Sequence, residues 1–280
     1  MTSSSNKKFT DLSKRLITGV IGAFIMLFAI YYSEWGFFAV FLFGLVMTQQ
    51  EFYKLIIANG VVPLKTFGTI VGIVLYTMIF MVERKVIPFD WFFMILPLTS
   101  TIFFIKLYKK DEKKPFTNIA FTFLGIIYVA LPFSLLSVAA YVHGYYSYQI
   151  VIGLFLILWA SDTGAYFAGI QFGKRKLFER VSPKKSWEGS VGGALLSLAF
   201  ACLISCYFED LEMWQWFVVS VITIVTGTYG DLVESLFKRS MDIKDSGRKL
   251  PGHGGFLDRF DGLLLSIPFI IIFLKYFVHN

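Results

Sequence analysis

The chain has 280 residues, of which 56% are hydrophobic and only 16% are charged, and its formal net charge is +7. Soluble domains have roughly 25% charged residues, so this composition excludes an ordinary soluble enzyme. The apolar residues fall in long, almost uncharged runs, each close to the ~20 residues that cross a hydrocarbon core. The sequence therefore predicts an all-α polytopic membrane protein.

Hydropathy predicts about nine transmembrane helices after a polar N-terminal tail at 1–13. The first apolar run follows a basic stretch, as in a signal peptide, but no convincing cleavage motif follows it, so we interpret it as a retained helix. We divide the spans into an N-terminal set at 14–145 and a C-terminal set at 146–280, which carries the candidate catalytic residues. The predicted helices are 16–32, 35–52, 66–82, 88–107, 117–140, 148–172, 189–207, 213–231 and 262–278.

The charges of the connections orient these helices. With nine spans and a cytoplasmic N-terminus, 23 of the 26 Lys and Arg residues fall on the cytoplasmic side, and only Arg84, Lys85 and Lys275 fall outside. The positive-inside rule predicts this partition. We therefore expect a multi-pass plasma-membrane protein with an external C-terminus and an active site toward the cytoplasm. Its basic face would meet the lipid bilayer, and we expect no nucleic-acid partner.

Asp162 lies inside the sixth predicted helix, in the segment SDTGAYFAG (161–169). A carboxylate within a membrane span is costly and indicates a functional site by default. Two roles stay open for it, a place in a polar site or an interhelical hydrogen bond. The neighbouring Gly164 and Gly169 favour close helix packing.

The connection before the seventh helix, KRKLFERVSPKKSWEGSVGG (174–193), is strongly basic. Lys184 and Lys185 follow Ser182 and precede a glycine-containing helix start. Cations beside a helix N-terminus suit a phosphate group. The alternative is an ordinary basic loop on the cytoplasmic side.

Seven polar residues flank the last connection: Asp231, Glu234, Ser235, Lys238, Arg239, Asp258 and Asp261. The first three lie at i, i+3 and i+4, so they share one helix face, which Lys238 extends. The last two repeat the i, i+3 spacing at the start of the ninth helix. Paired carboxylates repel one another unless a cation intervenes, and carboxylate oxygens suit Mg²⁺. These carboxylates predict a site for Mg²⁺, and the site has room in the prediction for a second cation. The alternative is that they are ordinary charges at a membrane boundary.

The segment KLPGHGGFLDRFDG (249–262) leads into the ninth helix. Gly254 and Gly255 allow backbone N–H groups to approach a ligand, and a helix N-terminus attracts anions. With Arg259 beside them, they predict a phosphate site next to the metal; the alternative is a flexible turn. We expect His253 to position a phosphate or the loop, because a phosphomonoester loses its second proton near pH ~6 without a base.

The stretch SLFKRSMDIKDSGRKLPGHGGFLDRFD (235–261) resembles the signature of phosphatidate cytidylyltransferases, also called CDP-diacylglycerol synthases. SDTGAYFAG and SPKKSWEG are similar to segments of bacterial members, so the resemblance extends over most of 150–280. The N-terminal half matches only in consisting of hydrophobic helices. Signature positions filled here include Ser235, Lys238, Arg239, Lys244, Asp245, His253, Gly254, Gly255, Asp258, Arg259 and Asp261.

The resemblance implies transfer of CMP from CTP to phosphatidic acid, dependence on Mg²⁺ and a homodimer. It associates Asp231 and Asp258 with the metal, and less directly Glu234 and Asp261. Two alternatives are a lipid kinase of the dolichol- or phytol-kinase type and a transporter, although a transporter would place its charges near the membrane midplane. The expected catalytic residues are Asp231, Asp258, Asp261, Lys238 and Arg239. The expected substrate-binding residues are Asp162, Ser182, Lys184, Lys185, Ser235, Lys244, His253, Gly254, Gly255 and Arg259.

Overall fold

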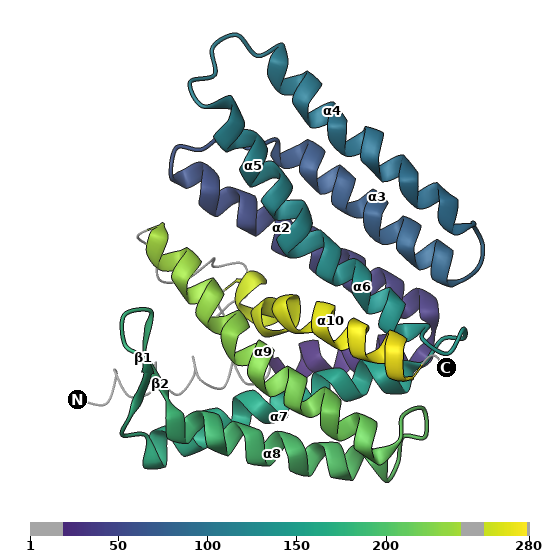
Figure 1. Cartoon of the computed structure of the whole chain (residues 1–280), viewed down its shortest axis with the longest axis vertical. Helices are drawn as coiled ribbons and strands as arrows, with labels where there is room; N and C mark the ends of the chain where they lie inside the picture. The colour runs from purple at the N-terminus through teal and green to yellow at the C-terminus, as the bar shows by residue number, and fades with distance from the viewer. Residues whose placement is uncertain (1–18, 242–254, 279–280) are drawn as a thin grey trace.

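The computed structural model describes residues 19–241 and 255–278, and this part of the chain is mainly helical (Figure 1). Eight of its helices are long and apolar enough to cross a membrane, and a shorter apolar helix, Gly19–Tyr32, precedes them. The predicted all-α polytopic membrane architecture is confirmed. The predicted first span begins outside the described residues, so the count of nine stays a prediction.

The N-terminal half forms four of the long apolar segments. Ser33 caps the first of them by accepting a hydrogen bond from the Gly36 N–H at 3.0 Å. The fourth is interrupted by a π-helical turn just before Pro132, a residue that cannot donate the usual helical hydrogen bond. The elements are α2 (Glu34–Ala58), α3 (Lys65–Glu83), the 3₁₀ turn η1 (Phe89–Met94), α4 (Ile95–Leu107), α5 (Pro115–Gly125), the π turn η2 (Ile126–Ala130) and α6 (Leu131–Ala140).

The C-terminal half contains four more long helices and a β-hairpin, and its last helix lies between α9 and α6 (Figure 1). Three helix bounds differ from the prediction by five residues or more: α2 continues past 52 to Ala58, α9 continues past 231 to Ser240, and α10 begins at Leu257 instead of 262. Charged residues lower the hydropathy at these ends without breaking a helix. The elements are α7 (Tyr148–Phe172), β1 (Lys176–Phe178), β2 (Ser182–Ser186), α8 (Trp187–Ser205), α9 (Met213–Ser240) and α10 (Leu257–Phe277).

The hairpin between α7 and α8 was not predicted. Its antiparallel strands pair Lys176 with Ser186 and Phe178 with Ser182. Ser186 also caps α8, accepting the Gly189 N–H at 3.1 Å. The Glu188 carboxylate accepts the backbone N–H of Lys174 at 3.0 Å, which fastens the end of α7 to the start of α8. The hairpin therefore holds the side chains of β2 in a fixed place beside the helices.

Small residues allow α7 and α8 to pack closely. A Cβ atom on Gly164 would lie only 2.6 Å from the Gly192 carbonyl oxygen, and one on Gly193 would lie 2.7 Å from the Ser161 carbonyl oxygen. Such contacts leave no room for a side chain, so the helix backbones touch directly. The packing predicted near Gly164 is confirmed, and it places Asp162 on a helix held tightly in position.

Candidate active site

A cavity of about 330 Å³ lies between α7, β2, α9 and α10. Nine of the predicted site residues line this cavity, and they come from four segments that are far apart in the sequence. Five of the nine are carboxylates and three are cations. The lining residues are Leu158, Trp159, Asp162, Lys185, Asp231, Glu234, Ser235, Lys238, Asp258, Arg259, Asp261 and Gly262.

One face of α9 supplies four of the lining side chains, as the helical spacing predicts. Lys238 is central among them: its Nζ lies 2.9 Å from Glu234 Oε2 one turn earlier and 2.9 Å from Asp258 Oδ1 on α10. Glu234 is only 2% exposed. A lysine thus separates two of the acids that were expected to meet around a metal, and it ties α9 to α10.

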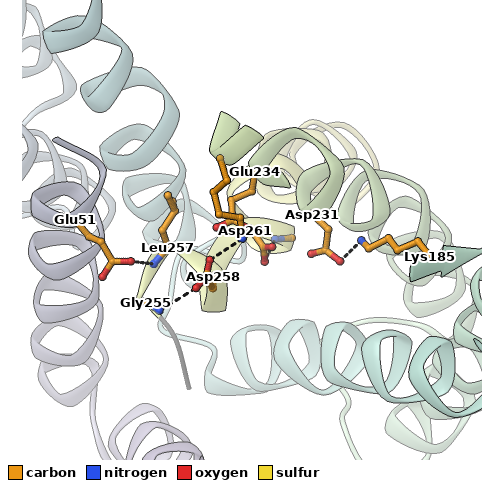
Figure 2. Close-up of polar contacts among 10 residues, drawn as sticks. Glu51, Lys185, Asp231, Glu234, Gly255, Leu257, Asp258 and Asp261 are labelled. Atoms are coloured by element: carbon orange, nitrogen blue, oxygen red, sulfur yellow. Dashed lines mark hydrogen bonds and ion pairs between the residues drawn. The ribbon is translucent and has the colours of Figure 1, made fainter. Parts of the chain in front are cut away.

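The hairpin supplies Lys185, which forms an ion pair with Asp231 on α9 (Figure 2). Both side chains are more than a quarter exposed, so the pair opens onto the cavity. Side chains alternate along a strand, and Lys184 is exposed and does not line the cavity. Ser182 on the same strand does not line it either.

The remaining predicted residues differ in where they lie. Asp162 on α7 and Arg259 on α10 line the cavity, which places Asp162 in the polar site. Arg239 is exposed at the end of α9 and does not line the cavity. Lys244, His253 and Gly254 lie outside the described residues.

The start of α10 binds carboxylates through its backbone. The Gly255 N–H donates to Asp258 Oδ2 at 2.9 Å, and the N–H groups of Phe256 and Leu257 donate to Glu51 at 3.1 and 3.4 Å (Figure 2). A phosphate at Gly255 would have to displace Asp258 from this N–H group. Sequence reasoning missed Glu51, whose only signal is a lone acid near the end of an apolar helix.

The two acid-bearing helices approach closely at glycines. A Cβ atom on Gly230 would lie 2.5 Å from the Asp261 carbonyl oxygen and 2.9 Å from the Gly262 Cα. The backbones of α9 and α10 are therefore in contact next to Asp231 and Asp261. This contact explains why residues thirty positions apart line one cavity.

The cavity fits a divalent cation by charge and donor type. Among the residues that the structure describes, its five carboxylates outnumber its three cations, and Glu234 Oε1 is buried without a hydrogen-bond partner. Hard oxygen ligands are those that Mg²⁺ prefers. Within 19–241 and 255–278, however, no three acidic, histidine or cysteine side chains are grouped to hold a metal, since lysines lie beside Asp231 and Asp258.

Comparisons with known proteins identify the family of the chain. The profile of the cytidylyltransferase family matches residues 13–277. The chain is 30% identical to the phosphatidate cytidylyltransferase of Bacillus subtilis over 277 residues, which cover 95% of this chain and 99% of the relative. It is 38% identical to that of Haemophilus influenzae over 184 residues, but this match spans only 64% of the relative's length. The chain therefore belongs to the cytidylyltransferase family.

Proposed function

We propose that the protein is a phosphatidate cytidylyltransferase, which transfers CMP from CTP to phosphatidic acid and supplies CDP-diacylglycerol for phospholipid biosynthesis. The observation that carries this proposal is the cavity, in which nine predicted site residues from α7, β2, α9 and α10 meet. Family membership over nearly the whole chain supports it. The lipid-kinase and transporter alternatives have no comparable support.

The reaction joins two anions. A phosphate oxygen of phosphatidic acid attacks the α-phosphorus of CTP, and the bond from that phosphorus to the bridging oxygen breaks, so that pyrophosphate leaves. Two unit charges 4 Å apart repel by about 4 kcal/mol at an effective dielectric of ~20. Lys185, Lys238 and Arg259 line the cavity and can neutralise and orient the phosphate groups. Without such cations, the two substrates would not approach.

Mg²⁺ would be held by Asp231 and Asp258, with Glu234 and Asp261 as further oxygen donors, and one or two cations can be accommodated by this set. When bound, Mg²⁺ would withdraw charge from the phosphate oxygens. The excess of carboxylates over cations in the cavity supports this assignment. Lys185 and Lys238, which now pair with Asp231 and Asp258, would then be available to the substrate phosphates.

The cavity faces the cytoplasm in this proposal, and the protein lies in a bacterial plasma membrane. Figure 1 shows the connections 59–64 and 108–114 at the same end of the helices as the β-hairpin, and the connections 84–88, 141–147 and 206–212 at the other end. Of the first group, the connection 108–114 and the β-hairpin are rich in lysine, as cytoplasmic connections are, whereas 59–64 contains none. Homodimer formation stays a prediction from the family resemblance.

The identity of the products tests the activity. Detergent-purified protein is incubated with phosphatidic acid, Mg²⁺ and each nucleoside triphosphate in turn. We expect CDP-diacylglycerol and pyrophosphate from CTP alone or preferentially. A nucleoside diphosphate as the product would establish a kinase instead, and absence of any turnover would favour a transporter or scaffold.

The carboxylates are tested separately. We predict that Asp231→Asn or Asp258→Asn abolishes CTP-dependent turnover, because each change removes a charged oxygen donor while preserving the size of the side chain. Asp231→Asn should change thermal unfolding little, since its pair with Lys185 is partly exposed, whereas Asp258→Asn also weakens the pair that ties α9 to α10 and should lower the unfolding temperature. Near-normal turnover in either variant would remove the proposed metal site. Removal of divalent cations with a chelator should stop the wild-type reaction, and added Mg²⁺ should restore it.

A further inference from the structure

Glu51 on α2 reaches the start of α10, although the two are about two hundred residues apart in the sequence. Its Oε2 accepts the Phe256 N–H at 3.1 Å and its Oε1 accepts the Leu257 N–H at 3.4 Å (Figure 2). The side chain is 3% exposed. A buried carboxylate therefore binds the first turn of the helix that carries Asp258 and Asp261.

This contact is a helix cap supplied by another helix. The first N–H groups of a helix have no partner within it, and a negative charge there is favoured by the helix dipole. The capping position of α10 is Phe256, whose side chain cannot accept a hydrogen bond. Glu51 accepts the N–H groups of the capping residue Phe256 and of Leu257, the first helical residue, while Asp258 accepts the N–H of Gly255, which precedes the cap.

We infer that Glu51 is a positioning residue for the proposed cytidylyl transfer: it satisfies the first turn of α10 so that Asp258 remains directed at the cavity. Asp258 has two tasks, since Oδ2 accepts from Gly255 and Oδ1 pairs with Lys238 at 2.9 Å. Without the Glu51 carboxylate, two N–H groups at this turn lose their acceptors. Asp258 is the carboxylate nearest in sequence that can accept from these N–H groups in place of Glu51. If it did so, its ion pair with Lys238 would break.

A purely structural role makes a different prediction. Aromatic contacts on both sides of Glu51 hold α2 against α9 and α10. Phe52 stacks on Phe237 with ring centroids 5.0 Å apart, and Phe43, two turns earlier, meets Phe256 edge-on at 5.7 Å. These contacts do not depend on the carboxylate. Loss of the Glu51 charge should therefore leave the helices packed while changing the direction of Asp258.

Gln49 offers a matched control on the same helix. It is fully buried, and its Nε2 donates to the carbonyl oxygens of Gly68 at 3.0 Å and Gly125 at 3.2 Å, both in the N-terminal half. Like Glu51, it joins α2 to the backbone of other segments through buried hydrogen bonds, although as a donor, and it does not line the cavity. A substitution there tests what loss of a buried hydrogen bond alone does to the enzyme.

The experiment compares kcat, KM for CTP and the unfolding temperature of the full-length chain in detergent for wild type, Glu51→Gln, Glu51→Asp and Gln49→Met. Glu51→Gln keeps the size of the side chain but removes its charge and one acceptor. We expect about a 10- to 100-fold fall in kcat, because misplacement of a reacting group by ~1 Å can cost about 100-fold, with KM within about 3-fold. Glu51→Asp, which keeps the charge on a shorter stem, should recover part of kcat.

The control separates positioning from stability. Gln49→Met should lower the unfolding temperature more than Glu51→Gln does, and lower kcat less. A wild-type kcat in Glu51→Gln would overturn the inference. It would also be overturned if kcat fell in proportion to the unfolding temperature in both Glu51→Gln and Gln49→Met. Failure of the wild-type protein to form CDP-diacylglycerol would refute the proposed function itself. Glu51→Asp also keeps the inference testable if Glu51→Gln does not fold.

Discussion

Lys185 and Lys176 show how strongly the effect of a cation depends on its position. Both lie on the β-hairpin, and from the sequence both belong to one basic connection. Lys185 pairs with Asp231 at the cavity, whereas Lys176 is exposed on β1 and does not line it. A preorganised cation in a substrate site contributes far more to a reaction than a solvated one.

We predict that Lys185→Met lowers kcat/KM for CTP by about 100-fold, since it removes a cation from the site where the phosphate charges meet. Lys176→Met has the same change in charge and composition on the same hairpin, and we expect an effect of about 3-fold or less. Steady-state kinetics on purified variants measures both. Similar losses in the two variants would mean that the hairpin acts only as a basic surface, the alternative that the sequence left open.

The residues of α9 were predictable because a helix converts sequence spacing into position. Asp231, Glu234, Ser235 and Lys238 share a face by their spacing alone, and all four line the cavity. Their partners were not predictable, since Lys185 comes from another segment of the chain. Contacts of this kind depend on tertiary packing, which no local pattern records.

At the level of helices, Gly230 determines how closely α9 approaches α10. A Cβ atom there would meet the backbone of Asp261 at 2.5 Å, a contact that no rotamer can relieve. Gly227, one turn earlier on the same helix, is less confined: its Cβ atom would lie 3.3 Å from a Leu158 methyl and 3.5 Å from Ser266 Oγ, both of which can move. The two glycines therefore form a matched pair.

We predict that Gly230→Ala destabilises the protein by about 1–3 kcal/mol, because overpacking forces the helix backbones apart. It should also lower turnover at least 10-fold, since the same shift separates Asp231 from Asp261. Gly227→Ala should change stability by less than about 1 kcal/mol, because a small clash is offset by the better helix propensity of alanine. Denaturation in detergent and kinetics measure these effects, and equal stability of the two variants would contradict the close-contact argument.

Helix positions were well predicted, but their ends and the short elements were not. Each long helix lies within a few residues of its predicted range except at the C-terminal ends of α2 and α9 and the start of α10, where charged residues lower the hydropathy while the helix continues. The hairpin was missed because strands of three and five residues with charged side chains carry no alternating apolar pattern. The π turn at Ile126–Ala130 has no periodic signal either.

At the scale of the whole molecule, one lysine counted among the loop charges has a different role. Lys106 is 2% exposed, and its Nζ contacts Glu112 and donates to the Val62 carbonyl oxygen at 2.8 Å. Asn118 also donates to Glu112 at 2.7 Å. Lys106 therefore joins the connections 59–64 and 108–114 at the same end of the helices. The lysines counted for the positive-inside rule thus include one that is buried and holds loops together, as well as solvated ones.

Two of the three cations predicted to lie outside, Arg84 and Lys275, have acidic partners. The Arg84 guanidinium pairs with Glu34 at 2.6 Å and lies 4.6 Å from the centre of the Trp35 ring, and Lys275 lies 3.9 Å from Glu83. The positive-inside rule counts Lys and Arg themselves and gives acidic residues little weight, so the small number of these cations is what matters for orientation. Their small number is what the proposed orientation predicts, in which the opposite end of the helices, with the cavity, lies toward the cytoplasm.

We predict that single cysteines report this orientation in intact cells of a bacterial expression host. In a background with Cys202 and Cys206 replaced by alanine, Val86→Cys lies in an exposed connection next to Arg84, and Asp111→Cys lies in an exposed lysine-rich connection. A membrane-impermeant maleimide should label the first directly and the second only after permeabilisation, because the membrane separates the two ends of the helices. Both variants should retain turnover as a control for folding. The reverse labelling would place the carboxylate cavity on the external side, where cytoplasmic CTP could not reach it.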